Sequence, residues 1–207
     1  MQKLTVLLLL AFVAASTFVH AQDTTRPPQN RNVEMGFRSS NYSGYGIFVA
    51  KEFTDVSVRL TAGVWESWQT RYLWESESNT VLYNMGLDVR SHAYLTHRFE
   101  FNIGIGTMYE IKQTEIGCGL CRNDSNNQSL NNVTTNTNTV TLGVCNGVAF
   151  KLNRFKIGVE LAYILTLDNY SKLEKYINPS ETRKIEHSGF VYNAHGFGYG
   201  LSIGYVF

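Results

Sequence analysis

The sequence predicts an all-β fold, an eight-stranded antiparallel up-and-down transmembrane β-barrel. Apolar residues alternate with polar residues or glycine through most of the chain, and this period of two identifies β-strands. The 207 residues include 12 Tyr, 12 Phe and only 3 Pro, a composition that favours strands with aromatic surfaces. Short turns alternate with long polar connections along the chain. A barrel of this length is expected to be one domain.

The N-terminal segment is predicted to be an export signal followed by a tail. Lys3 supplies a positive charge, residues 4–15 form an apolar run, and Ala21 ends a candidate cleavage site, so residues 1–21 are predicted to be a signal peptide. The apolar run is shorter than the roughly 20 residues that a membrane-spanning helix needs. Residues 22–32, which include Pro27 and Pro28, are predicted to form an extended tail.

The rest of the chain, residues 33–207, is predicted to form the barrel domain. Two less regular strands come first and six clearly alternating strands follow. The expected strands are residues 32–39, 44–53, 56–64, 81–90, 99–111, 140–152, 155–165 and 197–207.

The connections between these strands are of two kinds. Tight turns are predicted near residues 54–55, 96–98 and 153–154. Long polar connections are predicted at 40–43, 71–79, 113–138 and 168–184. Strict alternation of the two kinds places every tight turn at one end of the barrel, as in bacterial outer-membrane barrels with short periplasmic turns. Both termini, and the tail at 22–32, are then expected in the periplasm, with the long loops extracellular.

The polar face of the strands favours a lipid-facing barrel over a soluble sandwich. A solvent-exposed strand face gains nothing from glycine, whereas a crowded lumen needs small residues opposite large ones. The charges predicted to face the lumen are nearly balanced in sign and are expected to pair into an ionic plug, with a narrow ion path as the alternative. They are Glu34, Arg38, Glu52, Arg59, Asp88, Arg90, Glu100, Glu110, Lys151, Lys156 and Glu160.

Aromatic residues gather near the two ends of the predicted strands, as expected for rings at membrane–water boundaries. The girdle at the long-loop end is predicted to contain Trp65, Trp68, Tyr72 and Trp74. The girdle at the tight-turn end is predicted to contain Phe53, Phe99, Phe155, Tyr205 and Phe207.

The last strand carries a terminal motif of alternating apolar or aromatic residues that ends in Phe. Its members are Tyr199, Leu201, Ile203, Tyr205 and Phe207. This ending resembles the C-terminal signal that the barrel-assembly machinery of Gram-negative bacteria recognises, and the whole pattern resembles the porin-like OmpA/OmpX-type family of small outer-membrane barrels. The resemblance implies an integral outer-membrane location, with outer-membrane lipid and lipopolysaccharide as neighbours. The family is functionally mixed, so it does not identify an activity.

Cysteine and histidine residues offer weak functional signals. Cys118 and Cys121 lie in the longest predicted loop and form a candidate disulfide, with a redox or metal-binding pair as the alternative; Cys145 would be a buried thiol. His187 and Ser188 invite comparison with outer-membrane lipid A deacylases. That family places His and Ser two residues apart on one face, whereas adjacent residues in a strand point to opposite faces.

The remaining histidines, His92, His97 and His195, lack metal-ligand spacing and are expected to be structural. No cofactor or metal is expected. The formal charge of +1, with scattered Lys and Arg, makes nucleic acid an unexpected partner.

Three functions are compatible with these features. The first is a non-catalytic barrel whose surface loops bind a ligand or serve adhesion, or which is an accessory of a larger outer-membrane complex. The second is a passive pore for ions or small solutes, and the third is a lipid-modifying enzyme. The sequence favours the first, because no motif strongly supports the others.

Overall fold

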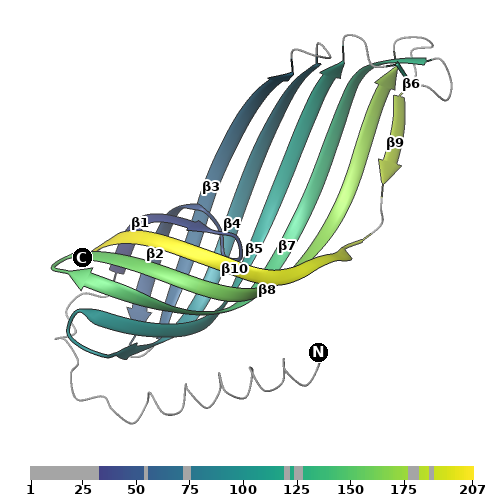
Figure 1. Ribbon diagram of the computed structural model, residues 1–207. Coiled ribbons are helices and arrows are strands. Elements are labelled where there is room, and N and C mark those ends of the chain that lie inside the picture. The colour runs from purple at the N-terminus through teal and green to yellow at the C-terminus, as the bar shows by residue number, and fades with distance from the viewer. Residues whose placement is uncertain are drawn as a thin grey trace.

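A computed structural model describes residues 33–53, 56–71, 76–118, 122–123, 128–176, 182–186 and 189–207. Ten strands occur in these ranges (Figure 1). They are β1 (Val33–Ser40), β2 (Gly46–Phe53), β3 (Val56–Arg71), β4 (Ser76–Tyr94), β5 (Phe99–Cys118), β6 (Arg122–Asn123), β7 (Gln128–Leu152), β8 (Phe155–Tyr176), β9 (Thr182–Glu186) and β10 (Val191–Val206). The described residues form no helix long and apolar enough to cross a membrane.

Eight of the strands close into a ring. The order around the ring is β1, β2, β3, β4, β5, β7, β8 and β10, and every neighbouring pair is antiparallel. The first and last strands of the ring join through pairs such as Phe37 with Ile203. Among the described residues β6 pairs only with β7 and β9 only with β8, so both lie outside the ring. The predicted eight-stranded up-and-down barrel is confirmed.

The barrel is closed along only part of its length. β1 and β2 have 8 residues each, whereas β5, β7 and β8 have 20, 25 and 22. β2 therefore pairs with β3 only as far as Ala62, and β1 pairs with β10 only between Gly200 and Val206. Beyond these points β3, β4, β5, β7 and β8 continue together as an open, curved sheet that rises away from the ring (Figure 1). We call this part the extension; it begins beyond Val64 on β3.

The end of the ring opposite the extension is the turn end. It contains Val33, Phe207 and the predicted tight turns at 96–98 and 153–154; Asn153 has a φ of 56°. Asn tolerates this left-handed conformation better than most residues, which suits a two-residue hairpin. The predicted turn at 54–55 and the predicted signal peptide and tail at 1–32 lie outside the described residues.

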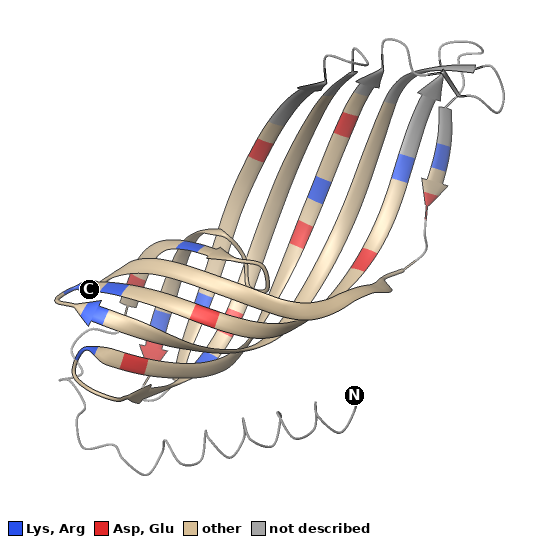
Figure 2. Ribbon diagram, in the orientation of Figure 1, with Lys and Arg blue, Asp and Glu red and all other residues tan. Residues whose placement is uncertain are grey.

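The outer face of the ring is apolar. Large apolar side chains such as Phe37, Leu60, Ile105 and Ile157 are exposed at every second position, while the residues between them face inward. Lys, Arg, Asp and Glu are scattered along the ribbon (Figure 2), and those of the ring lie mainly at inward positions. An apolar outer belt around a polar interior is the arrangement that a lipid bilayer requires of a barrel.

The extension differs from the ring on both faces. Along β7 it presents Thr135 and Thr137 on one face and Asn136 and Asn138 on the other, and all four are partly buried. Its edge on β3 is unpaired among the described residues beyond Ala62. Open sheet edges do not occur in the hydrocarbon region, because unpaired N–H and C=O groups there lack water. The extension therefore lies outside the hydrocarbon layer.

The predicted long connections at 71–79, 113–138 and 168–184 are wrong in large part, because strands occupy most of them. The strands continue through paired positions such as Gln113 with Asn136. Alternation fails in the extension because neither face is consistently apolar, so a search for one apolar face predicts loops there instead of strands. The fourth predicted connection, 40–43, is a tight turn.

Candidate functional site

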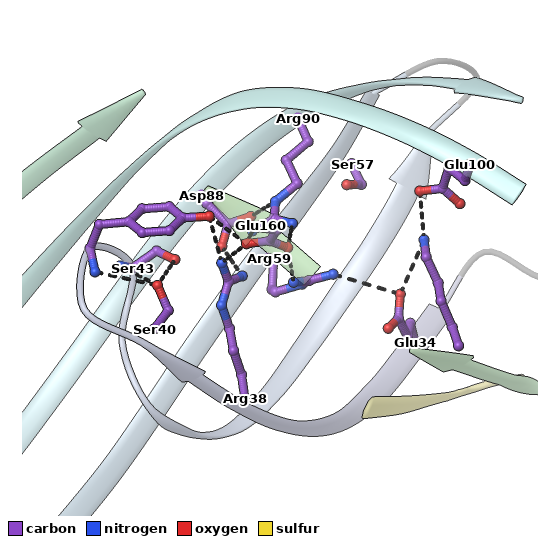
Figure 3. Close-up of polar contacts among 12 residues, drawn as sticks. Glu34, Arg38, Ser40, Ser43, Ser57, Arg59, Asp88, Arg90, Glu100 and Glu160 are labelled. Carbon is purple, nitrogen blue, oxygen red and sulfur yellow. Dashed lines mark hydrogen bonds and ion pairs between the residues drawn. The ribbon is translucent and has the colours of Figure 1, made fainter. Parts of the chain in front are cut away.

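A cluster of three arginines and two carboxylates fills the middle of the ring (Figure 3). Arg38 on β1 lies 2.7 Å from Asp88 and 2.5 Å from Glu160. Arg90 pairs with both carboxylates, and Arg59 lies 3.7 Å from Glu160. All five side chains are buried. Four strands thus contribute to one ionic cluster at one height of the lumen.

A second cluster lies closer to the turn end. Glu100 on β5 lies 2.8 Å from Lys156, 3.1 Å from Lys151 and 2.5 Å from His92. Lys156 also lies 3.6 Å from Glu34. Glu34 in turn lies 3.9 Å from Arg59, so the two clusters join into one network through Arg59 (Figure 3).

The network is balanced in charge. The cations are Arg38, Arg59, Arg90, Lys151 and Lys156, and the carboxylates are Glu34, Glu52, Asp88, Glu100 and Glu160. Glu52 joins the network through Tyr94, whose hydroxyl donates to it and accepts from Lys151. Buried charges are tolerated only when paired and hydrogen-bonded, and this balance provides the pairing. Ten of the eleven predicted lumen charges come together in this way.

Glu110, the eleventh, lies apart from the network. It sits on the inner face of β5 towards the extension, where its carboxylate accepts a hydrogen bond of 3.2 Å from the Tyr45 hydroxyl. Glu110 therefore lies at the end of the filled lumen that is nearest the extension.

The turn between β1 and β2 closes the lumen above the arginines. Tyr42 and Ser43 are fully buried, and the Tyr42 hydroxyl donates to Glu160 and accepts from Arg38 at 3.0 Å. Gly106 and Gly143 face the Tyr42 ring so closely that a Cβ on either would lie about 3 Å from it. The turn is therefore folded into the barrel as a plug, which the sequence analysis missed. The sequence signal for this packing was a pair of inward glycines, Gly106 on β5 and Gly143 on β7, which lie opposite each other in the two strands.

Asn84 on β4 completes the short β1–β2 hairpin. Its side chain accepts from the Tyr45 N–H at 2.9 Å and donates to the Gly63 carbonyl at 3.0 Å. These are backbone groups at the point where β2–β3 pairing ends. One amide side chain thus replaces ladder bonds that the short β2 cannot make.

Above the plug, the inner face of the extension is open. A register line crosses it through Trp65, Leu82, Lys112, Thr137 and Tyr170. Trp65 is 60% exposed. A Trp ring, a Leu side chain, an ammonium group, a hydroxyl and a Tyr ring therefore follow one another across the same face of the sheet. We call these five residues the inner surface.

The predicted aromatic girdle needs correction at Trp65. Trp65 lies on the same face of β3 as Arg59 and Thr61, so it faces inward, because side chains alternate along a strand. Beside the start of the extension, the outer face instead carries exposed Tyr83 and Tyr109. The side chain of Trp68 and all of Tyr72 and Trp74 lie outside the described residues.

The other predicted residues occupy varied places. Cys145 is a free, buried thiol beside Tyr42, whereas the side chains of Cys118 and Cys121 lie outside the description. His187 and Ser188 also lie outside it. The terminal motif lies on the outer face of β10, the strand that closes the ring; its members are Tyr199, Leu201, Ile203, Tyr205 and Phe207. No group of three potential metal-ligating side chains occurs within the described ranges.

Comparisons with known proteins support the fold. No family model and no curated protein sequence matches the chain. Among solved structures, a major outer membrane protein from Thermus thermophilus is similar, with a TM-score of 0.52 and 14% identity over 84% of this chain and 99% of that one. CarO of Acinetobacter baumannii has a TM-score of 0.45 at 10% identity, covering 88% of this chain and 100% of its own. The outer membrane protease OmpT of Escherichia coli has a TM-score of 0.44 at 9% identity, covering 89% of this chain and 99% of its own. The match to the Thermus protein thus shows that this chain has the fold of an outer-membrane β-barrel.

Proposed function

We propose that the protein is an integral outer-membrane barrel that binds a ligand at the cell surface through the inner surface of its extension. The observation that carries this proposal is the contrast between a filled ring and an open sheet. Among the described residues, Tyr42, the three arginines and their carboxylates fill the lumen, and this filling argues against passage of a solute. The extension lies outside the hydrocarbon layer, where its side chains meet water.

The orientation follows from the barrel's two ends. The turn end has short hairpins and the last residue of the chain, and in bacterial outer-membrane barrels such turns face the periplasm. The extension then faces the exterior. This placement also puts Phe207 on the periplasmic side, where the assembly machinery would meet the terminal motif.

The inner surface favours a hydroxyl-rich ligand. Trp and Tyr rings offer flat apolar faces, and Thr137, Lys112 and Asp168 offer donors and acceptors close by on the same face. Saccharide chains present both apolar ring faces and many hydroxyl groups. A carbohydrate of the cell surface, such as the glycan of lipopolysaccharide, is therefore the ligand class that we propose.

A passive pore is the weaker alternative. An eight-stranded barrel is barely wide enough for its own side chains, and here the inward turn adds a fully buried Tyr. The lipid-modifying alternative rests on His187 and Ser188, which the structure does not describe.

The test is purification of the tagged protein from native outer membranes in mild detergent, followed by sugar analysis and mass spectrometry of whatever co-purifies in stoichiometric amount. We expect bound glycan that falls at least tenfold in Trp65→Ala. Val64→Ala, which alters the outer face of the same strand, serves as the matched control and should retain the glycan. A stoichiometric protein instead of glycan would make the extension a subunit interface, and equal glycan in both variants would contradict the proposed surface.

A further inference from the structure

Two strands leave the ring with one edge unpaired. β3 pairs with β2 as far as Ala62, and residues 63–71 then have no neighbouring strand on that side among the described residues. β10 pairs with β1 as far as Gly200, and residues 191–199 likewise have no neighbouring strand on that side within the described ranges. The two open edges are therefore nine residues long each. Both begin at the rim of the ring, on either side of the short β1–β2 hairpin.

These edges lie in water and are poorly protected against pairing. Natural edge strands are blocked by proline, lysine, bulges or very short length, because an open ladder of N–H and C=O groups otherwise accepts another strand. The β3 edge, residues 63–71, contains neither proline nor lysine, and its register with β4 is unbroken as far as Arg71. The β10 edge has one register shift, between Tyr192 and Ala194. The extension thus offers backbone edges that suit β-strand addition, and the matching partner for such an edge is another extended polypeptide.

Strand direction indicates which polypeptide fits. β3 runs from the ring into the extension, whereas β10 runs back towards the turn end (Figure 1). Two copies inserted in the same orientation therefore bring β3 of one copy and β10 of the other together as antiparallel strands. A two-fold axis along the membrane normal makes this junction twice. Two β3 edges in the same membrane would instead run parallel, and parallel pairing is less stable per residue.

From these edges we infer that the protein forms a two-fold dimer in which β3 of each copy pairs with β10 of the other, outside the hydrocarbon layer. An antiparallel ladder provides on average one hydrogen bond per residue pair, so two nine-residue edges form roughly nine hydrogen bonds per junction. The two open sheets then close around one shared chamber, and closure removes the free edges.

The dimer completes the site that a single copy leaves open. The inner surfaces of the two copies, each with Trp65 and Tyr170, face the shared chamber from opposite sides. The junctions themselves are formed by strand edges, so dimer formation does not depend on the ligand that we propose for the inner surface.

The bilayer determines the register of the junction, because it holds the rims of both copies at the same height. Ser67 lies on the inner face of β3, five residues beyond Ala62. Ala194 lies on the inner face of β10, as Ser202 does, and is six residues beyond Gly200. Side chains on the same face at equal height are cross-strand neighbours in an antiparallel pair. Ser67 of one copy is therefore expected beside Ala194 of the other.

The first experiment places charges at these two positions. Ser67→Lys combined with Ala194→Lys puts like charges beside each other at both junctions, and like charges across strands are destabilising. Ser67→Glu combined with Ala194→Lys puts opposite charges there and is the matched control. The protein is extracted from native outer membranes in copolymer nanodiscs, and its mass is measured by light scattering. We expect a dimer for the unaltered protein and for the Glu/Lys variant, and a dimer-to-monomer ratio at least tenfold lower for the Lys/Lys variant.

The second experiment places a photo-cross-linking amino acid at Ser67 in otherwise unaltered protein in native outer membranes. We expect a product of twice the chain mass whose cross-link maps to residues 191–199 of the second copy. The same amino acid at Gln113, on the outer face of β5, is the control and should give no such product.

Heat-dependent gel mobility verifies that each variant is folded. A monomeric unaltered protein, or equal dimer in the folded Lys/Lys and Glu/Lys variants, would overturn the inference. A cross-link from Ser67 to a different protein would overturn it as well, because the edge would then belong to another partner. Glycan bound to a monomeric protein would refute the dimer and leave the proposed ligand standing.

Discussion

Replacing Glu160 by Gln should destabilise the barrel more than any other single change of a lumen charge. Glu160 accepts from Arg38 at 2.5 Å, from Arg90 and from the Tyr42 hydroxyl, and it lies 3.7 Å from Arg59. Its side chain is only 2% exposed. The amide keeps the shape but removes the charge, which leaves three guanidinium groups facing Asp88.

The expected loss follows from the cost of an uncompensated buried charge. Removing one partner of a buried ion pair costs about 3–5 kcal/mol, and the residual bonds of the amide to Tyr42 and the arginines favour the middle of that range. A loss of about 4 kcal/mol corresponds to roughly a thousandfold change in the unfolding equilibrium. The measurement is urea unfolding in phospholipid vesicles, followed by tryptophan fluorescence and gel mobility.

Glu115→Gln is the matched control for this experiment. Glu115 is exposed on the extension, where it accepts from Gln113 at 3.2 Å, and its neutralisation should change the free energy of unfolding by less than about 0.5 kcal/mol. A loss below about 1 kcal/mol for Glu160→Gln would refute the buried network as the origin of the stability of the ring.

Two further predictions test the plug and the membrane belt. Gly143→Val should lower the free energy of unfolding by about 1–3 kcal/mol in the same assay, because its Cβ would lie 2.9 Å from Tyr42 in the inward turn. Gly196→Val is the control and should lower that free energy less, because no atom lies within 4 Å of a Cβ built there. Equal losses for the two variants would contradict the packed plug. Ile105→Arg should lower the free energy of unfolding in vesicles by about 2–4 kcal/mol, because this side chain is 63% exposed and faces the bilayer interior. Gln113→Arg, on the same face of β5 but in the extension, should lower it by less than about 1 kcal/mol. Similar losses for the two variants would contradict the position assigned to the apolar belt.

The sequence predicted the ring well because its strands have one apolar and one polar face. Strands such as β5 and β10 were expected close to their observed bounds at the turn end, since alternation and short turns determine register there. The lumen charges were assigned to the correct face by the same alternation. Ten of them join one network, but alternation alone could not show which pairs form, because partners such as Arg38 and Glu160 are 122 residues apart.

Features that depend on tertiary packing were not predictable in this way. The strands of the extension have no consistently apolar face, so their sequences resemble those of loops. The inward turn of Tyr42 depends on glycines of β5 and β7 far along the chain. The hydrogen bonds of His92 to Ser57 and Glu100 could not be predicted either, because adjacent strands rather than sequence spacing bring the three residues together.

The most direct test of the account is single-channel recording in planar bilayers, because a filled lumen is the reason for placing the function outside the membrane. Insertion would be verified by recovering folded, heat-modifiable protein from the bilayer lipid. We expect no conductance steps from the unaltered protein or from Arg59→Gln. Reproducible steps whose size changes in Arg59→Gln would show that ions pass the arginine cluster, and would contradict the closed barrel.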